Sequence, residues 1–116
     1  MKKLILCLAL AALVSGCGIG SHTHNVANVT KSETIILNKN PRQGLIHSLS
    51  ITGHGKISGN AEIVLILNGG PYKIETLSGS VDFRWGGDWY SDQAEIRYTP
   101  TSVTGGSLRL KYKFND

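Results

Sequence analysis

Cysteines, prolines and long hydrophobic runs are all scarce in this chain. It contains two cysteines and three prolines among 116 residues. Cys7 lies inside the first apolar stretch, so a chain cut after that stretch keeps only Cys17 and cannot form an internal disulfide. Small secreted domains often depend on disulfides, so a domain without them has to be stabilised by its apolar core.

The short motifs of the common catalytic classes are also absent. The sequence has no Gly-x-Ser-x-Gly, no His-Glu-x-x-His and no phosphate-binding glycine loop. These absences favour a protein that is not an enzyme and that needs no cofactor. A small hydrolase with an unrecognised site is the alternative, and it would require His47 or His54 within hydrogen-bond reach of a serine and an acid.

One long apolar run is present, over residues 4–14, directly after Met1, Lys2 and Lys3. At about 1.5 Å rise per residue, its 11 residues cover roughly half of a ~30 Å hydrocarbon core. That length is too short for a stable membrane span and is typical of the hydrophobic segment of a signal peptide.

The order of a positive start, an apolar run and the residues Val14, Ser15, Gly16 and Cys17 resembles the leader and lipobox of bacterial lipoproteins. The resemblance covers about the first 17 residues, and Val14 stands where Leu is commoner. It implies a signal peptide over residues 1–16, cleavage between Gly16 and Cys17, and a lipid anchor of fatty acyl (palmitate-like) chains on Cys17. Two or three such chains hold a protein on a membrane durably, whereas one binds reversibly.

The same resemblance bears on localisation. In enterobacterial lipoproteins an Asp after the lipidated Cys retains the protein at the inner membrane, and this chain has Gly18 there. The resemblance therefore implies a bacterial, or phage-encoded, envelope protein sorted to the outer membrane, with its domain facing the periplasm or the cell surface.

Cleavage after residue 16 leaves 116 − 16 = 100 residues, which is enough for one modest domain. Loss of Lys2 and Lys3 lowers the count of Lys and Arg from 12 to 10 against 8 acids, a net charge of +2. This small and scattered excess argues against a nucleic-acid partner. No second apolar stretch reaches membrane-spanning length, so the lipid is the only membrane attachment that we expect.

Residues 17–33 are small and polar without sustained periodicity, which predicts a flexible tether. From residue 34 to 116 the apolar residues alternate with a period of two and turn residues interrupt them, including Asn68, Gly69, Gly70 and Pro71. The expected strands cover residues 34–38, 45–52, 56–58, 62–68, 72–77, 80–85, 94–98 and 107–114. We therefore predict an all-β domain, a small antiparallel β-sandwich of about seven or eight strands, with a small β-barrel as the alternative.

Three cations, Arg109, Lys111 and Lys113, share the solvent face of the last expected strand. Cationic side chains of this kind suit an edge strand, where they discourage pairing with another sheet. Weak attraction to lipopolysaccharide or anionic lipid headgroups is the other interpretation.

The richest candidate binding segment concentrates both tryptophans, a tyrosine and two carboxylates: Trp85, Asp88, Trp89, Tyr90 and Asp92. Aromatic faces can stack on sugar rings, and nearby carboxylates can accept hydrogen bonds from the sugar hydroxyls, so a carbohydrate-binding surface is one hypothesis. The competing interpretation places the aromatic residues in the core, because a small domain needs large apolar side chains there.

No metal site is expected. Asp82, Asp88 and Asp92 lack the spacing of a calcium-binding loop, and His22 and His24 have no cysteine or acid close by in the sequence. We therefore predict a membrane-anchored envelope lipoprotein whose β domain has a binding or structural accessory function. Its partner would be the membrane, with another envelope protein or a glycan as a further candidate.

Overall fold

The computed structural model describes residues 21–116, and these form one antiparallel sheet. Its strands are β2 (Ser21–Asn25), β3 (Glu33–Asn38), β4 (Ser48–Leu67), β5 (Gly70–Asp88), β6 (Gln93–Pro100) and β7 (Gly105–Asn115). The prediction of an antiparallel all-β domain is confirmed. The predicted signal peptide and Cys17 lie outside the described residues. Within residues 21–116, no helix has the length and hydrophobicity needed to cross a bilayer.

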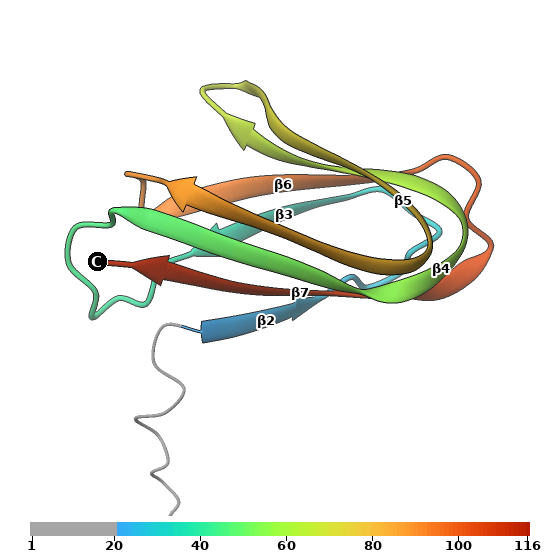
Figure 1. Ribbon diagram of the computed structural model, residues 1–116, viewed down its shortest axis with the longest axis horizontal. Helices are drawn as coiled ribbons and strands as arrows, with labels where there is room; N and C mark the ends of the chain where they lie inside the picture. Colours follow the sequence, from blue (N-terminus) through green and yellow to red (C-terminus); the bar gives the residue numbers. More distant parts are fainter. Residues whose placement is uncertain (1–20) are drawn as a thin grey trace, which may run out of the picture.

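The sheet curls because β4 and β5 form one long hairpin that belongs to two groups of strands (Figure 1). Residues 48–58 of β4 pair with β7, and residues 61–66 pair with β6. We call β2, β7 and the adjoining parts of β4 and β5 the β7 half, and β3, β6 and the remaining parts the β6 half. The two halves face each other in the manner of a half-barrel and enclose the core between them.

The bend in β4 coincides with a bulge between Ile57 and Asn60, where the register with β5 shifts. Gly59 sits in this bulge with φ +121°, a conformation that L side chains rarely adopt. A Cβ atom on Gly59 would lie 1.8 Å from the carbonyl oxygen of Ser102. The bulge therefore turns the strand and lets the loop after β6 approach its backbone.

Six strands are present within residues 21–116, so the predicted count of seven or eight is not confirmed, nor are two separate sheets of a sandwich. The difference arises because the glycines at positions 53, 55, 59 and 79 suggest breaks between short strands, whereas β4 and β5 run through them. A Cβ atom on Gly53 would lie 2.1 Å from the ring of Phe83, its partner on β5. Gly53 thus makes room for an aromatic ring inside a continuous strand.

β2 also differs from the prediction, because residues 21–25 were expected in a flexible tether. They pair with β7 from Ser21 opposite Lys113 to Asn25 opposite Arg109. The strand carries no strongly apolar residue, so its position depends on backbone pairing rather than on a hydrophobic pattern. The folded domain begins by Ser21 rather than at Thr34.

The prediction that residues 107–114 form an edge strand is wrong, because β7 lies between β2 and β4. The edges of the sheet are β2, β3 and β5. The alternation itself holds, since Leu108, Leu110 and Phe114 are buried while the cations between them are exposed.

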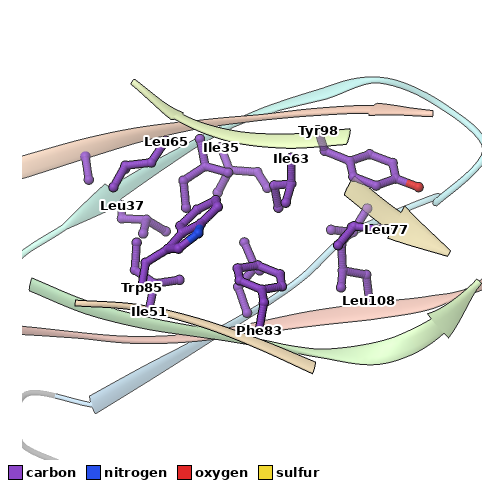
Figure 2. Packing of buried hydrophobic residues seen from close by; sticks show 14 of the residues in the cluster. Ile35, Leu37, Ile51, Ile63, Leu65, Leu77, Phe83, Trp85, Tyr98 and Leu108 are labelled. Atoms are coloured by element: carbon purple, nitrogen blue, oxygen red, sulfur yellow. The ribbon is translucent and has the colours of Figure 1, made fainter. Parts of the chain in front are cut away.

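The core lies between the two halves, and Figure 2 shows its packing. Trp85, Phe83 and Ile51 come from the β7 half and face Ile35 and Ile63 of the β6 half. The rings of Phe83 and Trp85 are tilted with centroids 4.8 Å apart, a favourable aromatic geometry.

Candidate functional site

The predicted binding segment spans the end of β5 and the loop to β6. Trp85 is 7% exposed and Trp89 is 5% exposed, so both indole rings belong to the core. Trp89 is held in place because its Nε1 donates a hydrogen bond to the carbonyl oxygen of Gln93 at 2.9 Å. Its backbone nitrogen donates to the carbonyl oxygen of His47 at 3.1 Å. Trp89 therefore closes the end of the core, as the competing interpretation predicted.

A small cavity lies beside these rings, and Tyr72, Trp85, Asp88 and Trp89 are among its lining residues. Its volume is about 10 Å³, which is room for about one water molecule and not for a sugar ring. The ring of Tyr72 lies 6.5 Å from that of Trp89 and covers one side of the cavity. The tryptophans therefore offer no free face to a glycan.

Tyr90 and Asp92 lie in a different place, on a shallow open hollow that Asn38, Lys39 and Gln93 also line. Tyr90 is 75% exposed. The polar groups around it are partly engaged, since Gln93 Nε2 donates to Asn38 Oδ1 at 2.8 Å and Lys39 Nζ lies 3.9 Å from Asp92 Oδ2. The structure thus divides the five predicted residues between a small cavity and an open hollow.

The histidines do not assemble a triad. His54 Nδ1 lies 3.6 Å from Asp82 Oδ1 on the exposed outer face of β4 and β5. No serine hydroxyl within residues 21–116 forms a hydrogen bond with His47 or His54. The requirement set for the hydrolase alternative is therefore not met in the part of the chain that the structure describes.

His22 and His24 occupy the inward side of β2. His24 Nε2 lies 2.9 Å from Glu33 Oε2, and Glu33 Oε1 accepts a hydrogen bond from the backbone nitrogen of Ala27 at 3.1 Å. This link was not predicted from the sequence because the two partners lie nine positions apart. No group of three or more metal-ligating side chains is present in the described part of the chain.

The three cations predicted on the solvent face of residues 107–114 belong to a larger concentration of like charge. Five exposed cations lie on the outer surface of the β7 half, which we call the basic face: Lys56, Arg84, Arg109, Lys111 and Lys113. Thr52 lies between Lys111 and Arg84 on adjoining strands. Lys56 lies on β4, which pairs with β7, and Arg84 lies on β5, which pairs with β4. Their place on this surface follows only when β4 and β5 are each recognised as one continuous strand.

The pKa shifts belong to structural contacts. Burial raises the pKa values of Tyr98 and Tyr112. A hydrogen bond from the backbone nitrogen of Gly44 at 2.8 Å is the main cause that lowers the pKa of Asp116. The Asp116 contact fixes the end of the chain to the loop before β4, and none of the three groups forms part of a reactive cluster within residues 21–116.

The comparisons with known proteins add no family. A scan against models of protein families gives no match, and a search of curated proteins gives no significant relative.

Proposed function

We propose that this protein is a lipid-anchored lipoprotein of the bacterial envelope whose β domain has a binding or structural accessory function. The observation that carries the proposal is the order of the first 17 residues, in which a positive start and a short apolar run lead to Cys17. The position of β2 is consistent with it, because the folded domain begins only four residues after Cys17.

A carbohydrate-binding function is the second candidate, and one observation favours it. Tyr90 is the exposed aromatic side chain of the predicted segment, and it lies with Asp92 on an open hollow. Glycan-array binding by the wild type that disappears in Tyr90→Ala would support this candidate. Equal binding by both proteins would remove it.

Acylation of Cys17 is tested by growing cells with an alkyne fatty acid and detecting the label on the purified protein. The wild type should carry the label and Cys17→Ala should not. Cys7→Ala is the matched control, because Cys7 leaves with the leader and its loss should not change labelling. Mass spectrometry that finds an uncut amino terminus and an unmodified Cys17 would overturn the proposal.

Sorting is tested separately from acylation. If the outer membrane is the destination, the wild type should fractionate with outer-membrane markers on a density gradient. Gly18→Asp should move the protein to the inner-membrane fraction without reducing its acyl label. Fractionation of both proteins with the inner membrane would contradict outer-membrane sorting and leave the lipid anchor standing.

A further inference from the structure

The basic face has no structural explanation in the sheet itself. Four of its five cations cannot protect an edge, because β7 and the first part of β4 are interior strands, and only Arg84 lies on an edge strand, β5. Arg109, Lys111 and Lys113 follow one another at every second residue of β7, about 6.6–6.8 Å apart along the strand. Like charges at such spacing repel, and an external anionic partner would relieve that repulsion.

These charges are also unpaired. Within residues 21–116, none of the five cations has a carboxylate within 4.0 Å. Two carboxylates lie on the same surface. Asp82 is close to His54 rather than to a Lys or Arg, and Asp88 lies at the end of β5, at the margin of the face. The face therefore presents a net positive surface to the solvent.

The outer surface of the β6 half is different. It carries Glu62 and Glu95 with one cation, Arg97, whose Nε lies 2.7 Å from Glu95 Oε2. Ile36 and Ile74, 50% and 54% exposed, lie on the same surface. The two outer surfaces of the molecule thus differ in charge, and the cations concentrate on only one of them.

The start of β2 places the basic face near the membrane. Ser21 lies opposite Lys113, which is itself opposite Ser50 of β4. Ser21 is the fourth residue after Cys17, and a fully extended chain spans at most about 14 Å between them. Charges interact over roughly 8 Å at physiological salt, and a link this short allows Lys113, which lies opposite Ser21, to come within that range of the headgroups.

We propose that the basic face lies against anionic phospholipid headgroups of the bilayer that holds the lipid on Cys17. The inference rests on the proposed acylation of Cys17. Each Lys or Arg close to an anionic surface contributes about as much as a fivefold change in binding. Five such residues would orient the tethered domain flat on the bilayer and turn the β6 half toward the solvent.

The orientation can be measured with the mature acylated protein in lipid nanodiscs. Because Cys7 is removed and the sulfur of Cys17 is occupied, Ser50→Cys introduces a single free thiol on the basic face. Thr76→Cys introduces one on the outer surface of the β6 half. A bulky maleimide reagent reports the access of each thiol in neutral nanodiscs and in nanodiscs that contain phosphatidylglycerol.

We expect anionic lipid to slow the modification of Ser50→Cys by about tenfold or more and to leave Thr76→Cys unchanged. High salt should remove the protection. In the Ser50→Cys background, Arg109→Gln with Lys111→Gln should restore reactivity to within about twofold of that in neutral lipid. The control pair Lys31→Gln with Arg97→Gln removes the same number of charges outside the basic face, and it should leave the thiol protected.

The outcomes separate the two proposals. Absence of an acyl mass on Cys17 would overturn the lipoprotein proposal. An acylated protein whose Ser50→Cys thiol reacts equally fast in both lipids would overturn this inference alone. Protection by soluble polyphosphate but not by anionic nanodiscs would also overturn it and assign the basic face to a soluble polyanion.

Discussion

The hydroxyl of Tyr98 is a buried polar group with a single partner. It donates a hydrogen bond to the carbonyl oxygen of Val29 at 2.6 Å and ties β6 to the loop between β2 and β3. Tyr98→Phe leaves that carbonyl without a donor, which should lower the free energy of unfolding by about 1–3 kcal/mol in urea denaturation. Tyr90→Phe is the control and should change it by less than about 0.5 kcal/mol, because Tyr90 is exposed. An equal effect of both would contradict this account.

Trp89 and Tyr90 are neighbours in sequence with opposite environments. Trp89→Ala removes a core side chain and should cost roughly 3–5 kcal/mol of stability. Tyr90→Ala should cost about 0.5 kcal/mol or less. Thermal unfolding followed by circular dichroism distinguishes them, and a small cost for Trp89→Ala would show that its ring is not part of the core.

At the scale of the strand, Gly59 decides whether β4 can bend. Gly59→Ala places a Cβ atom against the carbonyl of Ser102 and strains a backbone with positive φ, so it should destabilise the domain by roughly 1–3 kcal/mol. Gly70→Ala is the control, since nothing lies within 4 Å of its Cβ position, and it should stay within about 1 kcal/mol of wild type. Chemical denaturation of both variants tests the difference. Equal stabilities would show that the bulge does not require glycine.

The strands were predictable where alternation was unbroken, as in residues 94–98 and 107–114. The turn at Asn68 and Gly69 was also predictable, and both residues have the positive φ values of a hairpin turn. Gly53 misled the prediction because its role depends on Phe83, thirty residues away. β2 was missed because its pairing uses backbone groups, which leave no mark on the side-chain pattern.

The candidate site was predicted only as a segment. Its sequence could not show that Trp85 and Trp89 turn inward while Tyr90 turns outward, because that choice depends on the bend of β5 and the Gln93 carbonyl. Of the basic face, the sequence predicted only the three cations of β7: Arg109, Lys111 and Lys113. Its other members, Lys56 and Arg84, join it through the pairing of distant strands.

For the whole molecule, Asp116 links the end of the chain to the loop before β4, and its pKa is lowered mainly by the Gly44 backbone nitrogen. A lowered pKa stabilises the folded state above the unfolded value and loses that effect as pH falls through the folded value. Wild-type stability should therefore fall more steeply than that of Asp116→Asn below about pH 4. Urea midpoints from pH 7 to pH 3 measure this, and parallel curves for the two proteins would contradict it.

The hairpin of β4 and β5 contributes strands to both halves of the sheet, so neither half has a boundary at which it could come away intact. Partial opening is confined to segments with few shared contacts, and here such segments are short. Proteases would then meet this domain either fully closed or fully open. Its lifetime in the cell would depend on the equilibrium for global unfolding. A destabilising substitution in either half would therefore make the whole domain accessible to degradation.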